Sequence, residues 1–294
     1  MRKLNGFTPL EGPRLAGIQI RIPNRESGRF LTGSVRVNFS NGAGFTLIEL
    51  LLVIAIIALL LAILMPALQL VKKQAKAVAC QSNLRQWGLY FSLYTDDNNG
   101  YFHRGWNSGA YSEDSWMVVL RPYYSDDKKL CCCPTATKPR DEGADATFGA
   151  WTNFYDEHGS YGINICVTDP PPGREGGRPP EWYWRNRDVK GAANIPLFLD
   201  DYWWDTRPHH TDEPPQYEGQ VEDWTTNAMK MLCLNRHNGY TNVVFIDFST
   251  RTAGLKELWT FKWNREFNTA GPYTRAGNVL VEDWPLWMRN FKDY

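Results

Sequence analysis

A chain of 294 residues is long enough for one sizeable globular domain with additional segments. Its formal net charge is zero, but residues 1–94 carry eleven Lys and Arg against three Asp and Glu, which leaves residues 95–294 acidic. An acidic domain repels phosphate backbones, so the composition argues against nucleic acid as a partner and favours solubility or cation binding.

The first predicted element is a basic N-terminal leader, residues 1–44. It carries seven Lys and Arg against Glu11 and Glu26, a bias that favours its retention on the cytoplasmic side of a membrane. The sequence indicates no fold for this leader, so it is predicted either to be disordered or to result from a misassigned start codon.

The second element is an apolar run from Leu50 to Val71 that contains no charged residue. Twenty-two residues at about 1.5 Å each match a hydrocarbon core about 30 Å thick. A secretory signal peptide has a shorter apolar region of about 7 to 15 residues. A helix that is apolar on every side would otherwise need a much larger protein around it. The run therefore predicts one membrane-spanning helix.

Glu49 stands at the edge of this run. A carboxylate drawn to the middle of a bilayer costs on the order of 2.5 to 3.5 kcal/mol unless it finds a partner. Either Glu49 lies at the headgroup level and needs no partner, or it pairs with a cation that assembly supplies. The sequence Gly44-Phe45-Thr46-Leu47-Ile48-Glu49, with the apolar run behind it, resembles the class III signal of type IV pilins and type II secretion pseudopilins.

This resemblance implies that a prepilin peptidase cleaves between Gly44 and Phe45 and methylates the new N-terminal Phe45. Glu49 then becomes the fifth mature residue, where it can neutralise the terminal amine of a neighbouring subunit. Pro66 stands where many pilins carry a helix-bending proline. The chain departs from the usual pattern in its long leader and in Asn41-Gly42-Ala43, which replaces a basic residue beside the glycine.

Beyond Pro66 the pattern becomes amphipathic and continues the helix out of the membrane. Apolar side chains recur at spacings of three and four, so one face of the helix is expected to pack on a soluble head. The residues on this face are Ala77, Cys80, Leu84, Trp87, Phe91 and Tyr94. Together with the apolar run they predict one helix over residues 45–94, about 75 Å long, which the polar sequence 96–100 ends.

Residues 95–294 are predicted to form an acidic head that contains twelve of the thirteen Trp residues. Residues 195–201 and 241–247 are typical of strands, the first of which ends at Asp200 and Asp201. A long helix packed on an antiparallel sheet is an α+β architecture and matches the pilin fold. Asp200 and Asp201 offer oxygen donors for calcium, the one cofactor that the sequence leaves open.

The six cysteines contain no CxxC pair, so their spacing predicts no metal site. Cys80 lies on the buried helix face and is expected as a core thiol or as half of a disulfide. Three adjacent thiols cannot all point in one direction, so residues 131–134 resemble a chain turn more than a metal site. One of these three is a candidate to pair with Cys166.

His237 and Asp247 carry a second resemblance. Residues 236–239 (RHNG) followed by 243–247 (VVFID) are similar to the His-x9-Asp-Gly region of a large pilin-like family abundant in planctomycete- and lentisphaera-type bacteria. Residues 80–86, 94–98 and 255–260 are also similar to that family. Phe248 stands where the family has a glycine, in a tight turn.

No catalytic site is predicted. His237 and Asp247 resemble a base and its orienting partner, but the chain has no Gly-x-Ser-x-Gly elbow, no Gly-rich phosphate loop and no His-Glu-x-x-His. We expect the two residues to hold the ends of a hairpin by hydrogen bonding. His209 and His210 lie in a Pro-rich loop, where solvated histidines are the ordinary case. The chain is therefore not expected to be an enzyme.

Two functions remain open. The first is a structural subunit of a type II secretion pseudopilus or type IV pilus-like filament. Such a subunit has prepilin peptidase, other pilin subunits and the inner membrane as partners, a cytoplasmic N-terminus before cleavage and a periplasmic or extracellular head. The second is a minor tip subunit whose head binds polysaccharide. Aromatic side chains beside the Pro-rich loops would then stack on sugars; they are Trp182, Trp184, Trp203 and Trp204.

Overall fold

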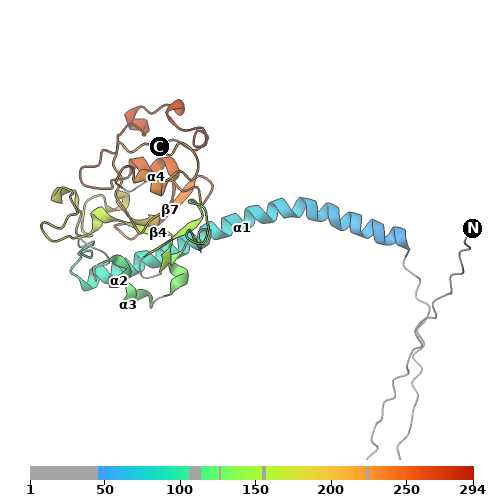
Figure 1. Ribbon diagram of the computed structural model, residues 1–294, viewed down its shortest axis with the longest axis horizontal. Helices are drawn as coiled ribbons and strands as arrows, with labels where there is room; N and C mark the ends of the chain where they lie inside the picture. The colour runs from blue at the N-terminus through green and yellow to red at the C-terminus, as the bar shows by residue number, and fades with distance from the viewer. Residues whose placement is uncertain (1–45, 106–113, 126, 154–156, 223–224) are drawn as a thin grey trace, which may run out of the picture. The chain divides into compact units, whose positions relative to one another are not determined.

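The computed structural model describes residues 46–105, 114–125, 127–153, 157–222 and 225–294 (Figure 1). The chain divides into two compact units, Met1–Ala62 and Ile63–Tyr294.

Helix α1 (Leu47–Asp97) is 51 residues long and confirms that the apolar run and the amphipathic segment form one helix. The helix contains one proline, Pro66, and one glycine, Gly88, and it continues through both. The helix ends where Asn99 and Gly100 adopt positive φ angles of 55° and 83°. The backbone N–H of Gly100 donates to the carbonyl of Thr95 at 2.7 Å, which satisfies one of the last carbonyl groups of α1.

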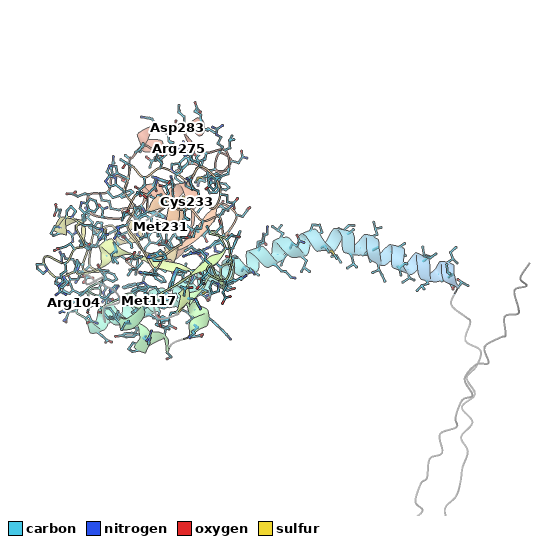
Figure 2. The ribbon with its side chains drawn as sticks, viewed as in Figure 1. Arg104, Met117, Met231, Cys233, Arg275 and Asp283 are labelled. Atoms are coloured by element: carbon cyan, nitrogen blue, oxygen red, sulfur yellow. The ribbon has the colours of Figure 1, made fainter. Side chains whose placement is uncertain are left out.

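In the first unit, the described residues 46–62 are helical from Leu47, and their apolar side chains project on all sides of the helix (Figure 2). Leu47 and Ile48 are 77% and 74% exposed. Among the described residues, α1 is the one helix long and apolar enough to cross a membrane, with a mean hydropathy of 3.3 over its most apolar 18 residues, none of them buried. A surface this apolar requires lipid or other helices to cover it.

The second unit is built round a five-stranded sheet with the strand order β6-β4-β5-β7-β8. Its strands are β4 (Tyr161–Asn164), β5 (Pro196–Asp200), β6 (Asp205–Thr206), β7 (Tyr240–Phe245) and β8 (Thr250–Gly254). Strands β4, β5, β7 and β8 are antiparallel, as predicted, but the edge strand β6 runs parallel to β4. The two strands expected at 195–201 and 241–247 are β5 and β7.

A smaller sheet and several short helices complete the second unit. The sheet contains β1 (Lys138–Pro139), β2 (Gly149–Thr152) and β3 (His158–Gly159). The short α-helices are α2 (Trp116–Val119), α3 (Arg121–Tyr124) and α4 (Met229–Leu232). The 3-10 helices are η1 (Lys128–Cys131), η2 (Ile165–Val167), η3 (Pro180–Trp182), η4 (Ala192–Asn194), η5 (Leu255–Thr260), η6 (Arg275–Gly277) and η7 (Val281–Asp283).

Side chains alternate between the two faces of the large sheet, as the period of two in a strand requires. On one face, Phe198 of β5 and Val244 of β7 join a core cluster with the buried face of α1. On the other face, Leu199 of β5 joins a cluster with side chains of the C-terminal segment. The sheet is therefore covered on both faces, by the second half of α1 and by the end of the chain.

The contact between α1 and the sheet depends on Trp87 and Gly88. The ring of Trp87 is fully buried, lies 5.3 Å from the ring of Phe198 between centroids and donates from Nε1 to the carbonyl of Leu130 at 2.7 Å. A Cβ atom on Gly88 would lie 3.1 Å from the carbonyl oxygen of Phe248. The missing side chain of Gly88 therefore lets the helix approach the turn between β7 and β8 closely.

Candidate functional site

The N-terminus of α1 is fixed by reciprocal hydrogen bonds between Thr46 and Glu49. The Oε2 atom of Glu49 accepts from the backbone N–H of Thr46 at 2.8 Å and from its hydroxyl at 2.7 Å. The backbone N–H of Glu49 donates to Thr46 Oγ1 at 3.3 Å. This is a capping box, for which the sequence signal is the Thr-x-x-Glu spacing that coincides here with the prepilin pattern.

Glu49 is exposed in the isolated chain, and Thr46 is the polar partner that the described residues give it. The carboxylate therefore has a second role, in helix capping, besides the assembly role that the sequence predicts. Gly44 and Phe45, the predicted cleavage and methylation residues, lie outside the described residues. Their roles stay predictions.

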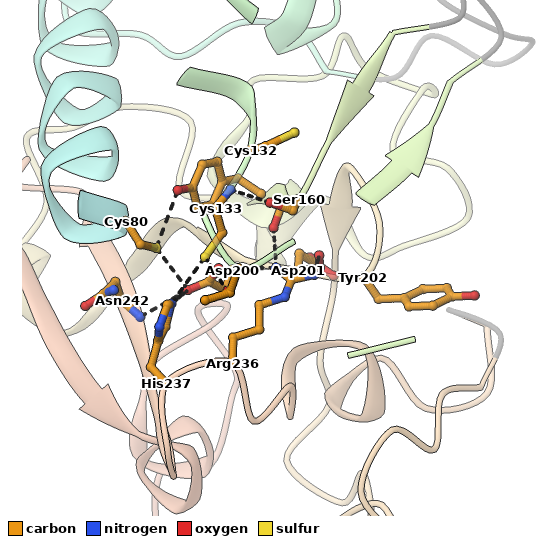
Figure 3. Close-up of polar contacts among 12 residues, drawn as sticks. Cys80, Cys132, Cys133, Ser160, Asp200, Asp201, Tyr202, Arg236, His237 and Asn242 are labelled. Atoms are coloured by element: carbon orange, nitrogen blue, oxygen red, sulfur yellow. Dashed lines mark hydrogen bonds and ion pairs between the residues drawn. The ribbon is translucent and has the colours of Figure 1, made fainter. Parts of the chain in front are cut away.

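A second site is a buried cluster of four donor groups, which we call the four-donor cluster: Cys80, Cys133, Asp200 and His237. The four residues come from separate parts of the second unit (Figure 3). Cys80 lies on α1, Cys133 follows η1, Asp200 ends β5, and His237 precedes β7. One ligand atom from each residue lies within 4.8 Å of those of the other three.

The distances within the four-donor cluster are short. The Nε2 atom of His237 lies 3.3 Å from Asp200 Oδ2 and 3.4 Å from Cys133 Sγ. The Sγ atom of Cys80 lies 3.5 Å from the same Oδ2 atom. The four groups thus converge on one point, with a single nitrogen of His237 facing both the carboxylate and a thiol.

Arg236 forms an ion pair with the second carboxylate oxygen of Asp200, Oδ1. Its Nη1 atom lies 3.2 Å from Asp200 Oδ1, and both side chains are completely buried. The guanidinium also donates to four backbone carbonyls, those of Thr147, Gly149, Ser160 and Asp201. Because every contact of this kind is directional, Arg236 orients the carboxylate so that Oδ2 faces the cluster.

The charged groups in the cluster shift one another's pKa values strongly. Burial alone would raise the pKa of Asp200, but His237 and Arg236 outweigh burial and hold that pKa well below its usual value. Burial would lower the pKa of His237, but Asp200 raises it to about 10. Burial would raise the pKa of Cys133, but hydrogen bonding from Cys80 and His237 lowers it to about 6. The pKa of Cys80 is raised well above its usual value, chiefly by burial.

The structure does not bring His237 and Asp247 together. They lie at opposite ends of β7, and Asp247 Oδ1 instead accepts from the backbone N–H and the hydroxyl of Ser249, at 3.0 and 2.6 Å. The hydrogen bond that we expected between them is therefore not among the interactions of the described residues. Phe248 keeps the tight turn although it is not glycine, with a φ of 63°.

Asp200 and Asp201, suggested by the sequence as calcium ligands, point to different partners. Asp200 belongs to the four-donor cluster, whereas Asp201 Oδ1 accepts from the backbone N–H of Trp203 at 3.1 Å. Both side chains are buried. Calcium binding stays a prediction.

All six cysteines are free thiols. Cys166 is 1% exposed in the core and forms no disulfide with any of the three adjacent cysteines. These three do point differently, as expected, since Cys133 enters the four-donor cluster while Cys132 Sγ lies 3.8 Å from the carbonyl of His158. Sequence spacing missed the four-donor cluster because its members are separated by 53, 67 and 37 positions (80 to 133, 133 to 200 and 200 to 237).

A long helix with an exposed apolar N-terminal part, whose second half packs on a sheet, defines an α+β pilin-like architecture. Residues 40–65 match the family described as the prokaryotic N-terminal methylation motif. The motif contains the predicted cleavage residues, and Glu49 with its capping partner.

The chain is similar to the type IV wide pilus major component PilA4 of Thermus thermophilus, with 46% identity over 61 residues. That alignment covers 21% of this chain and 47% of the relative, so the chain spans about half the length of the curated relative it matches. No solved structure matches the chain. The motif and the relative support a type IV pilin-like or pseudopilin-like protein with a class III prepilin signal.

Proposed function

We propose that the chain is a structural subunit of a type IV pilus-like filament or a type II secretion pseudopilus. A prepilin peptidase cleaves it between Gly44 and Phe45 and methylates Phe45, and α1 anchors it in the inner membrane before assembly. The observation that carries this proposal is the methylation motif at 40–65, placed at the start of a helix whose apolar side chains are exposed on all sides.

The apolar surface of α1 is covered in both of the environments that the proposal requires. In the membrane, lipid covers the exposed side chains of α1. In a filament, the same helices of neighbouring subunits cover one another, and the new terminal amine of one subunit meets Glu49 of the next. The carboxylate is available for this contact because it is exposed and Thr46 is its partner from the described residues.

Mass analysis of the membrane-extracted protein tests the processing step. We expect a mature chain that begins with N-methyl-Phe45, and we expect Gly44→Val to prevent cleavage because a branched side chain obstructs the peptidase site. Gly42→Val, two residues upstream, is the matched control and is expected to be cleaved normally. An intact leader in the wild-type protein, or a cut at another bond, would show that the motif is not used.

A second experiment separates the two kinds of filament. Deletion of the gene is expected either to stop export of secreted proteins, which indicates a pseudopilus, or to remove sheared surface filaments, which indicates a pilus. Loss of neither would contradict the proposal.

The polysaccharide alternative has weaker support from the head. Trp184 and Trp204 are 8% and 2% exposed, so neither offers a ring face to a sugar. Trp204 packs against Trp151, and Trp184 donates to the carbonyl of Trp263. Glycan binding stays a prediction that rests on the partly exposed Trp182 and Trp203.

A further inference from the structure

We propose that the four-donor cluster binds one divalent cation of the zinc type in tetrahedral coordination, and that this ion fastens α1 to the head. Each of the four side chains offers one ligand atom, and these atoms come from α1, the loop after η1, the end of β5 and the turn before β7. Two sulfurs, one nitrogen and one oxygen are a ligand set that suits zinc.

Three of the six distances between the donor atoms agree with a single central ion. Zinc bonds are about 2.3 Å to sulfur and about 2.0 to 2.2 Å to nitrogen and oxygen. In a tetrahedron, such bonds place a nitrogen and an oxygen about 3.4 Å apart, and a sulfur about 3.6 Å from either. The corresponding distances are 3.3 Å between His237 and Asp200, 3.4 Å between His237 and Cys133, and 3.5 Å between Cys80 and Asp200.

The orientation of His237 favours a metal over a catalytic triad. In a nucleophile–base–acid relay, one imidazole nitrogen faces the nucleophile and the other faces the acid. Here Nε2 faces both Cys133 and Asp200, and among the described residues Nδ1 has no hydrogen-bond partner. Donors directed at one common point are what a metal ion requires.

Side chains that contact three of the ligand residues orient these ligands. Arg236 binds the Oδ1 atom of Asp200, which leaves Oδ2 for the ion. The hydroxyl of Tyr161 donates to Cys80 Sγ at 3.4 Å, and Thr135 Oγ1 lies 3.0 Å from Cys133 Sγ. Hydrogen bonds of this kind orient ligands and stabilise a thiolate, and their loss typically costs about 10- to 100-fold in metal affinity.

Charge balance also favours a divalent ion. On binding, Cys80 and Cys133 coordinate as thiolates and His237 coordinates through Nε2 as a neutral ring, and the protons that these three side chains hold beforehand are released to solvent. Two thiolates and the Asp200 carboxylate then face a double positive charge and Arg236, so the buried site has no net charge. A neutral site avoids the large cost of an unpaired charge in the core.

A cavity adjoins the buried cluster at His237. His237 lines a cavity of about 170 Å³ together with Ala77, Gln81 and Thr252. The cavity lies between α1 and the sheet, and it is the route that we propose for the ion.

The test is metal binding by the full-length chain purified in detergent under reducing conditions, with Zn²⁺ and Co²⁺ as probes. We expect about one Zn²⁺ per chain, a thiolate-to-cobalt charge-transfer band with Co²⁺, and X-ray absorption that fits two sulfurs at about 2.3 Å with nitrogen and oxygen at about 2.0 to 2.2 Å. We expect Cys133→Ser to weaken Zn²⁺ binding by more than tenfold and to remove most of the charge-transfer band.

Cys132→Ser is the matched control, because the adjacent thiol points out of the cluster, and it is expected to bind as the wild type does. Tyr161→Phe keeps all four ligands and is expected to lower the affinity by about 10- to 100-fold. This variant tests the site even if Cys133→Ser does not fold. The proposal is overturned if the reduced, folded chain takes up neither ion, or if Cys133→Ser binds as tightly as Cys132→Ser. It is also overturned if chain isolated without reductant contains a Cys80–Cys133 disulfide and does not bind Zn²⁺ after reduction.

Discussion

The guanidinium of Arg236 and the carboxylate of Asp200 form an ion pair in which neither side chain has any exposed surface, with Nη1 and Oδ1 3.2 Å apart. An ion pair without solvent stabilises a fold only if the remaining hydrogen-bonding groups are satisfied. Arg236 meets this condition through four backbone carbonyls, which belong to β2, to the loop before β2 and to the segments that flank β4 and β5. One side chain thereby joins the smaller sheet to the larger one.

We expect Arg236→Met to destabilise the head by about 3 to 5 kcal/mol, because it leaves the Asp200 carboxylate and several carbonyls buried without a partner. The measurement is urea unfolding followed by tryptophan fluorescence. Arg251→Met is the matched control, since Arg251 is 41% exposed in its ion pair with Glu257 and such a pair contributes about 0 to 1 kcal/mol. Equal losses in the two variants would contradict the structural role of Arg236.

Because Glu49 belongs to a capping box with Thr46, two variants are needed to test its role in assembly. Glu49→Ala removes both the helix cap and the charge, whereas Glu49→Gln keeps an acceptor at the cap position and removes the charge alone. We expect both variants to be cleaved and inserted in the membrane, and both to give a much lower yield of sheared filaments than the wild type. A normal yield from Glu49→Gln, with a low yield from Glu49→Ala, would show that Glu49 acts only as a cap.

His103 is expected to make the head less stable in mild acid. The side chain is buried, and burial lowers its pKa from 6.5 to about 4. Between these two values the unfolded chain binds a proton that the folded chain does not, so the free energy of unfolding falls as the pH falls from about 6.5 to 4. A shift of this size corresponds to a loss on the order of 2 to 4 kcal/mol.

The measurement for His103 is the difference in unfolding free energy between the wild type and His103→Gln as a function of pH. This difference removes the opposite contribution of Asp205, whose pKa burial raises to about 6. A difference that is constant between pH 7 and 4 would show that His103 does not titrate in this way.

Gly88 provides a test of how α1 packs on the sheet. We expect Gly88→Leu to destabilise the head by about 1 to 3 kcal/mol, because the new side chain meets the carbonyl of Phe248 and the side chain of Val244. Arg85→Leu adds the same side chain to the exposed face of the helix and is expected to change stability little. Thermal unfolding of both variants gives the comparison, and a Gly88→Leu variant as stable as Arg85→Leu would contradict the close approach.

Local patterns in the sequence were sufficient to predict several elements. The charge-free run 50–71 predicted an apolar helix, and apolar spacings of three and four predicted that Cys80, Leu84 and Trp87 lie on its buried face. Short apolar runs beside turn residues predicted β5 and β7. Each of these signals is contained within a few turns of helix or a few strand residues, so no knowledge of distant contacts was needed.

Tertiary structure alone decided which distant residues meet. The sequence suggested His237 as the partner of Asp247, but an extended strand holds its two ends apart, and β7 separates these residues. The packing of α1 on one face of the sheet instead brings Cys80 to His237, and the neighbouring strand β5 supplies Asp200. Burial of Trp184 and Trp204 was decided in the same way, because whether an aromatic ring faces solvent depends on what the rest of the chain places over it.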